Sequence, residues 1–137
     1  MDRINKAIEY HKNGCNCAQA VACAFTDVLN MDEESVYHLT EAYGSGIGGL
    51  REICGAVNAG VLVLSMHQSK DPLYKKENRQ ETYKKAKEYV EAFQSVDGTY
   101  LCGELLDLRK EGKSNFPSCQ DCVIKATELL EEFLKEE

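Results

Sequence analysis

Residues 50–67 read LREICGAVNAGVLVLSMH, and this stretch decides the fold. From Ala56 to Met66 it is apolar almost all round, whereas a helix at a protein surface carries one apolar stripe opposite a polar face. We therefore predict a helix over 50–67 that is central and enclosed. Its small residues allow neighbouring helices to come close, and they are also compatible with a homodimer; they are Gly55, Ala56, Ala59 and Gly60.

Helical periodicity extends over nearly the whole chain. Apolar stripes predict further helices at about 4–11, 16–30, 32–43, 73–95, 97–108 and 118–134. Asn13-Gly14 is a helix stop, residues 69–72 and 109–117 are breaks, and Ser118 with Asp121 predicts a capping box at the start of the last helix. No convincing strand alternation appears. We predict one all-α domain over residues 1–137, a helical bundle of about six to seven helices.

Composition and charge exclude several classes of protein. The 137 residues are 28% charged and 43% hydrophobic, which is typical of a globular chain. A net charge of −7 argues against nucleic acid, because binding there requires a basic patch. No stretch approaches the roughly 18 apolar residues of a membrane span. The first residues lack an apolar signal-peptide core, so we expect a cytoplasmic location.

Seven cysteines are many for such a chain. Four of them fall at predicted helix starts: Cys17, Cys54, Cys102 and Cys119. Packing alone gives cysteine no reason to favour these positions, whereas the positive end of the helix dipole favours a thiolate there. Cytosolic thiols are normally kept reduced, so metal binding, cluster binding and redox chemistry are favoured over structural disulfides. The pattern indicates sulfur chemistry.

The four cysteines lie in recognisable surroundings. They are Asn16-Cys17-Ala18-Gln19-Ala20-Val21, then Cys54-Gly55-Ala56-Val57 after a glycine-rich loop, then Cys102 before Glu104-Leu105-Leu106, and Cys119 ahead of Val123. This order resembles the family of small putative redox-active proteins named for its C_GCAxxG_C_C pattern, over about 120 residues. One local departure is that Ile53, rather than glycine, precedes Cys54. The resemblance implies a redox or metal-related role and four functional cysteines.

The separation of these four cysteines limits what they can form. They are too far apart in sequence for two local C-x-x-C zinc knuckles, so they can meet only through the tertiary fold. Four thiolates gathered together would repel one another unless a metal or cluster neutralised them. We therefore predict an iron–sulfur cluster or other metal bound by Cys17, Cys54, Cys102 and Cys119, for electron transfer or redox sensing with an unidentified redox partner protein. A structural zinc-binding module is an alternative.

A second alternative is an enzyme. Cys119-Gln120-Asp121-Cys122 is a C-x-x-C at a predicted helix start, the arrangement of thiol–disulfide oxidoreductases, in which Cys119 would attack and Cys122 or another nearby thiol would resolve. Cys15 and Cys23 are interpreted as neighbouring and packing residues, and the three histidines as residues of helix surfaces or ends. The loop 44–49 has two interpretations, a backbone wrapped closely around the Cys54 site or a flexible connection. Arg51 beside it could support an anion or the Cys54 thiolate.

Overall fold

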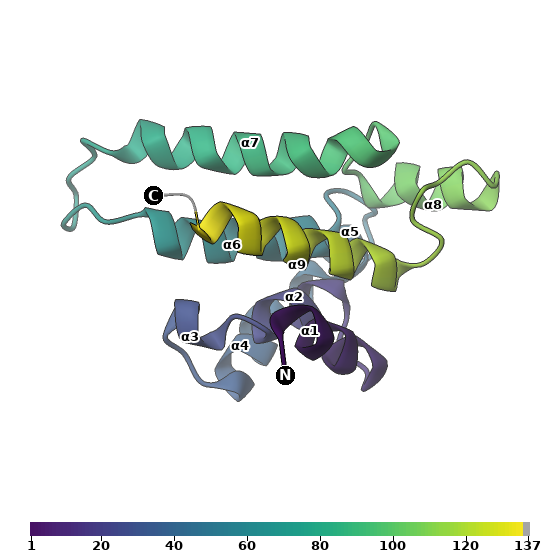
Figure 1. Cartoon of the computed structure of the whole chain (residues 1–137), viewed down its shortest axis with the longest axis horizontal. Coiled ribbons are helices and arrows are strands. Elements are labelled where there is room, and N and C mark those ends of the chain that lie inside the picture. Colours follow the sequence, from purple (N-terminus) through teal and green to yellow (C-terminus); the bar gives the residue numbers. More distant parts are fainter. Residues whose placement is uncertain (136–137) are drawn as a thin grey trace.

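Helix α6 (Gly55–Gln68) lies at the centre of the fold, as predicted, in a computed structural model that describes residues 1–135. It packs against α2 (Cys17–Cys23), α7 (Arg79–Asp97) and α9 (Cys119–Lys135). Figure 1 shows the three long helices α6, α7 and α9 side by side, with the first four helices gathered on the other side of α9 from α7.

The remaining elements are shorter. They are α1 (Arg3–Lys12), α3 (Thr26–Leu29), α4 (Glu33–Thr40), the 3₁₀ helix η1 (Glu41–Tyr43), α5 (Gly44–Ile47) and α8 (Cys102–Lys110). Seven helices of residues 1–135 have seven or more residues, and the one β pairing in this range is an isolated bridge between Ile53 and Leu101. The predicted all-α class and the number of helices are confirmed.

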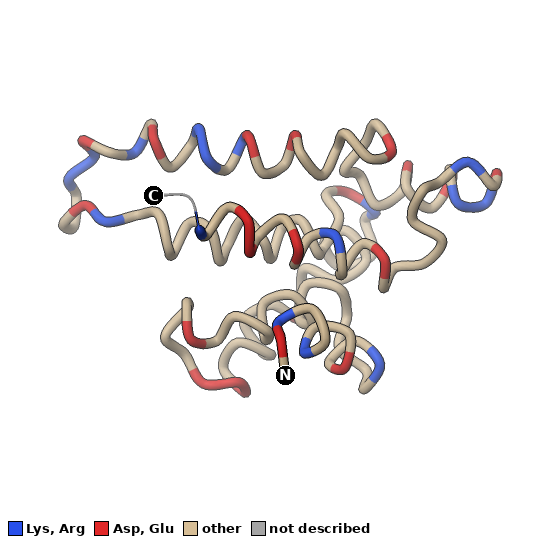
Figure 2. The backbone as a smooth tube through the Cα atoms, viewed as in Figure 1, with Lys and Arg blue, Asp and Glu red and all other residues tan. Residues whose placement is uncertain are grey.

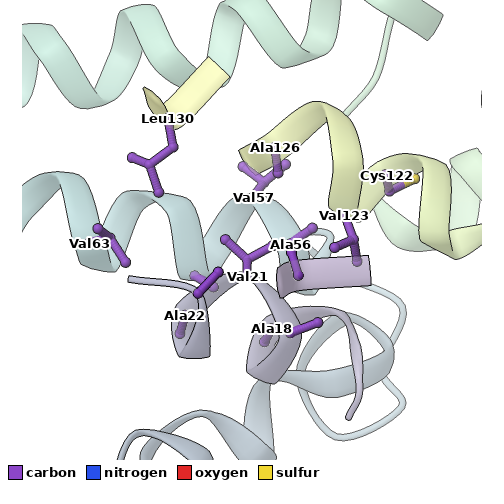
Figure 3. Close-up of a cluster of buried hydrophobic side chains, with 14 of the residues drawn as sticks. Ala18, Val21, Ala22, Ala56, Val57, Val63, Cys122, Val123, Ala126 and Leu130 are labelled. Atoms are coloured by element: carbon purple, nitrogen blue, oxygen red, sulfur yellow. The ribbon is translucent and has the colours of Figure 1, made fainter. Parts of the chain in front are cut away.

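The core lies where α2, α6 and α9 meet. Alanine and valine side chains from the three helices interdigitate there, and Cys122 lies at the end of this cluster (Figure 3). Charged residues are spread along α7, as Figure 2 shows, whereas α6 contains no Lys, Arg, Asp or Glu. The small residues of α6 are buried within the chain, so a homodimer would need another surface.

A tyrosine joins the three long helices. The buried Tyr89 of α7 donates a hydrogen bond of 2.8 Å to the carbonyl oxygen of Ala126 on α9. Its ring passes directly over Gly60 of α6, where a Cβ atom would overlap it. Gly60 is therefore needed for the close approach of α6 and α7.

Two predicted helix boundaries are wrong near the N-terminus and in the middle. The predicted helix 16–30 is broken at Phe25. Here the Arg3 guanidinium donates a hydrogen bond of 2.8 Å to the carbonyl oxygen of Ala24, and its Cζ lies 4.4 Å from the centroid of the Phe25 ring. The predicted helix 73–95 begins only at Arg79. Asp71 accepts hydrogen bonds from the backbone and side chain of Asn78, both at 2.8 Å, and these hold the preceding residues in a turn.

The start of the central helix also differs. It was predicted at Leu50 but lies at Gly55, because residues 52–54 pair with 100–102 through the bridge of Ile53 with Leu101 and its flanking hydrogen bonds. The helix predicted at 97–108 is α8, which begins at Cys102 and includes Arg109 and Lys110. The break at 69–72 and the start of the last helix after Ser118 agree with the prediction.

Candidate functional site

All four predicted cysteines occupy helix starts. Cys17, Cys102 and Cys119 are the first residues of α2, α8 and α9, and Cys54 directly precedes the first residue of α6. The backbone N–H groups of a first turn have no partner within the helix, so each start presents partial positive charge to the sulfur beside it. The predicted placement of these four cysteines at helix starts is confirmed.

Local side-chain caps fix two of these starts. The Asn16 side chain accepts a hydrogen bond from the backbone N–H of Gln19, and the Gln19 side chain accepts one from the N–H of Asn16, both at 2.9 Å. The predicted capping box of α9 is also present, because the backbone N–H of Ser118 donates to Asp121 at 2.9 Å and the N–H of Asp121 donates to the Ser118 hydroxyl at 3.4 Å. Such caps hold the following cysteine in place.

Cys54 and Cys102 are aligned by backbone pairing that the sequence analysis missed. The N–H of Cys54 donates to the carbonyl of Tyr100 at 2.8 Å, and the N–H of Cys102 donates to the carbonyl of Glu52 at 2.7 Å. These bonds flank the bridge of Ile53 and Leu101. At α6, Gly55 lets the helix start approach both η1 and α2, since a Cβ there would lie 2.9 Å from the Tyr43 carbonyl oxygen and 3.3 Å from the Ala18 backbone nitrogen.

The four helix starts open onto one cavity of about 470 Å³. Five cysteines line it, namely Cys17, Cys54, Cys102, Cys119 and Cys122. Arg51, Arg109 and His11 line it as well, as do Ser45, Gly46 and Gly49 of the glycine-rich loop. The distant cysteines are thus brought to one place by the fold, and the loop lies against their site rather than apart from it.

Cys17 and Cys119 form the first thiol pair in this cavity. The Cys17 thiol lies 3.9 Å from the backbone carbonyl oxygen of Cys119, to which it donates. Hydrogen bonding between the two side chains lowers the pKa of Cys119 to about 5 against the opposing effect of partial burial. The same bond, with burial and the neighbouring cysteines, raises the pKa of Cys17. Cys119 is exposed and Cys17 is partly buried. The accessible member of the pair is therefore the charged one.

Cys54 and Cys122 form the second pair, and both are buried. The Cys122 thiol donates a hydrogen bond to Cys54, which lowers the pKa of Cys54, and the backbone amides of Val57 and Ala56 lower it further. The same bond raises the pKa of Cys122, together with burial. From the sequence, Cys122 was considered as a partner of Cys119 in exchange and not as a partner of Cys54.

Arg109 connects the two pairs. Its Nη1 lies 3.4 Å from Cys119 Sγ and its Nη2 lies 3.8 Å from Cys122 Sγ, while its Nε donates to the carbonyl of Phe116 at 2.8 Å. Arg109 was not among the predicted site residues because residues 109–117 were expected to form a loop. Its signal was the spacing from Cys102, since seven residues make about two helical turns and place both side chains on one face.

The other residues considered from the sequence divide into two groups. Arg51 is exposed and also lines the cavity, and its charge lowers the pKa of Cys102, although burial, Cys54 and Cys119 raise it overall. His11, interpreted as a surface residue, has its Nε2 4.0 Å from Cys17 Sγ. Cys15 and Cys23 lie outside the cavity and contact the core.

A metal centre requires ligand atoms arranged around one point, which a shared cavity alone does not provide. Within residues 1–135, no three Cys, His, Asp or Glu side chains are arranged as ligands of one metal ion. The donor chemistry of Cys17, Cys54, Cys102 and Cys119 is that of a cluster or soft metal. The side chains would have to leave the two hydrogen-bonded pairs to serve as its ligands.

Comparison with known proteins gives one match. Residues 15–133 match the model of the family described as "Putative redox-active protein (C_GCAxxG_C_C)". The chain belongs to this family. The match spans all five cysteines of the cavity, so the family resemblance seen in the sequence is confirmed. Neither a curated protein nor a solved structure matches the chain. No helix within residues 1–135 is long and apolar enough to cross a membrane.

Proposed function

We propose that this protein carries out thiol–disulfide exchange, with Cys119 as the attacking thiolate and Cys17 as the resolving thiol. The observation that carries the proposal is the state of Cys119: exposed at the first residue of α9, hydrogen-bonded by the Cys17 thiol and 3.4 Å from the Arg109 guanidinium. A thiolate is the nucleophile in such exchange, and these surroundings favour it at neutral pH.

The reaction balances without a cofactor. The Cys119 thiolate attacks one sulfur of a substrate disulfide, and the other substrate sulfur leaves as a thiolate. Cys17 then attacks Cys119 Sγ, which releases the second substrate thiol and leaves a Cys17–Cys119 disulfide. Two electrons pass from the protein to the substrate. The proton of the Cys17 thiol and one from solvent complete the two substrate thiols.

Cys17 replaces Cys122 in the resolving role that the sequence suggested. Cys122 is buried, whereas the partly buried thiol of Cys17 already donates a hydrogen bond to the backbone carbonyl oxygen of Cys119 at 3.9 Å. We expect the protein to act in a reducing compartment such as the cytoplasm, where its thiols are regenerated.

Oxidised glutathione, a small disulfide, serves to test the exchange. We expect the reduced protein to convert it to thiol and to form a Cys17–Cys119 disulfide, identified by alkylation and peptide mass mapping. Cys119→Ser should lose this activity, and Cys23→Ser, which changes a buried cysteine outside the cavity, should retain it. Equal exchange by Cys119→Ser and the unaltered protein would refute the proposal.

A second comparison isolates the resolving thiol. In Cys122→Ser, Cys17 remains able to resolve a mixed disulfide between Cys119 and glutathione, so that species should be short-lived. In the double variant Cys17→Ser/Cys122→Ser it should accumulate. If the mixed disulfide persists equally in both variants, Cys17 is not the resolving residue.

A second candidate function is an iron–sulfur cluster or other metal held by Cys17, Cys54, Cys102 and Cys119, with zinc as the simplest ion. It is favoured by one observation, that the starts of four helices bring these four cysteines to the same cavity. When bound, a cluster would supply one-electron transfer. The residues present would act as its ligands, and Arg51 and Arg109 would offset their negative charge.

Cys102 distinguishes the two functions, because it is a ligand in one and has no part in the other. Anaerobic purification should be followed by a visible spectrum and by iron, labile sulfide and zinc analysis. Broad visible absorption that disappears in Cys102→Ser supports the cluster. Stoichiometric zinc in colourless protein supports the zinc module. Metal-free protein whose disulfide exchange survives Cys102→Ser supports the thiol mechanism.

A further inference from the structure

The thiol mechanism leaves a buried cysteine pair without a role. Cys54 is 6% exposed and Cys122 is 2% exposed, and yet both line the cavity that contains Cys17 and Cys119. Cys23, by contrast, is buried but does not line this cavity. This pair instead lines the cavity together with Arg109, whose Nη2 lies 3.8 Å from Cys122 Sγ.

We propose that Cys54 and Cys122 form a second redox couple, which receives the disulfide first made at Cys17 and Cys119 and so gives the site a capacity of four electrons. The inference rests on the thiol–disulfide function proposed above.

The route follows from the spacing on α9. Cys119 and Cys122 are three residues apart on one helix, so their side chains are neighbours on the same face. Arg109 contacts both sulfurs, at 3.4 and 3.8 Å, and its guanidinium can stabilise negative charge as it passes between them. Cys119 is thus adjacent to Cys17 on one side and to Cys122 on the other.

The transfer consists of two exchanges that need no outside reactant. Cys122 attacks Cys119 Sγ of the Cys17–Cys119 disulfide, so that an S–S bond forms between Cys119 and Cys122 and Cys17 leaves. Cys54 then attacks Cys122 Sγ, and Cys119 leaves as a thiolate. The proton of the Cys122 thiol passes to Cys17, and the negative charge passes from Cys54 to Cys119. Electrons, protons and charge are conserved.

Burial gives the transfer its direction. A disulfide carries no charge, and the interior position of Cys54 and Cys122 accommodates a neutral group better than an ionised one. The charge released at Cys119 is exposed to water and lies beside Arg109. After transfer, Cys17 and Cys119 are again a reduced pair and can act on a second disulfide.

The test follows the position of the disulfide over time. Fully reduced protein is mixed with one molar equivalent of oxidised glutathione, quenched with iodoacetamide at intervals and mapped by peptide mass spectrometry. We expect Cys17–Cys119 early and Cys54–Cys122 later, with Cys17 and Cys119 recovered as alkylated thiols. Excess oxidant should then produce both disulfides.

Variants define the route. In Cys119→Ser the buried pair should stay reduced, because the oxidant enters through Cys119, and in the Cys23→Ser control both disulfides should form in order. Equally rapid formation of Cys54–Cys122 in Cys119→Ser would overturn the relay. So would wild-type protein whose oxidation ends at Cys17–Cys119 under excess oxidant, a result that leaves the proposed function intact. Failure to form any disulfide among these four would refute the proposed function itself. The order of disulfide formation in the wild-type time course tests the relay without depending on whether a variant folds.

Discussion

Removal of the Arg109 charge should make Cys119 a weaker acid by a predictable amount. The pKa of Cys119 is lowered to about 5 by the Cys17 hydrogen bond first and by Arg109 second, against partial burial. An opposite charge within about 4–6 Å typically lowers a pKa by about 1–3 units. Because Cys119 is exposed and Cys17 is unchanged, we expect Arg109→Gln to raise its pKa by about 1–2 units.

The assay is the rate of iodoacetamide alkylation of Cys119 as a function of pH, read from its own peptide by mass spectrometry. Only the thiolate reacts, so the rate rises through the pKa and then levels off. The unaltered protein should reach its plateau just above the pKa of about 5, and Arg109→Gln about 1–2 pH units higher. Lys110→Gln removes the next charge on α8 and should leave the curve in place. Coincident midpoints for Arg109→Gln and the unaltered protein would refute the electrostatic argument.

Three further outcomes follow from the packing, the capping and the charge of the site. Gly60→Ala should destabilise the protein by about 1–3 kcal/mol in urea unfolding, because its Cβ would overlap the buried Tyr89 ring, whereas Met66→Ala on the exposed part of α6 should cost less. Asn16→Ala should cost about 1 kcal/mol in the same assay through loss of the α2 cap. The pKa of Cys119 in the folded protein lies below its unfolded value of about 8.5, so the stability it contributes is present above pH 8.5 and lost as the pH falls through about 5. Urea titrations of reduced wild type and Cys119→Ser should therefore converge in acid.

The all-α fold class could be predicted from the sequence because the spacing of apolar residues shows which side chains are buried. Residues 55–66 have no charged side chain, and the helix they form is the one enclosed by α2, α7 and α9. The cap of α9 was readable too, since Ser118 and Asp121 satisfy the helix start by themselves. Where local chemistry determined the structure, the prediction was correct.

The boundaries that failed depend on partners distant in sequence. Helix α2 ends early because Arg3, more than twenty residues away, binds the Ala24 carbonyl. Helix α6 starts late because residues 52–54 pair with 100–102. The apolar periodicity within a segment carries no information about such a distant partner. A prediction from that periodicity therefore continues the helix until the next glycine, proline or polar break.

The site was predictable in its members but not in their pairing. Helix-start positions identified Cys17, Cys54, Cys102 and Cys119, and all four line one cavity. Which thiols are paired as neighbours depends on how α9 is rotated about its axis against α2 and α6. That rotation places Cys119 beside Cys17 and turns Cys122, three residues later, toward Cys54. A C-x-x-C motif seen alone suggests instead that its own two cysteines are partners.

The charges of the cavity explain why so many helices begin there. Cys119, whose pKa is about 5, and Cys54, whose pKa is lowered by the Cys122 side chain, line the cavity with two arginines, Arg51 and Arg109, whose charges oppose those of thiolates. The remaining stabilisation comes from backbone N–H groups at four helix starts, which cannot titrate and remain in place when a thiolate becomes a disulfide. A site whose sulfurs change charge with oxidation therefore benefits from fixed dipoles, because a mobile countercharge would have to move at every step. The short helix α8 fits this logic: it contributes one helix start through Cys102 and, two turns later, the Arg109 side chain that contacts both cysteines of α9.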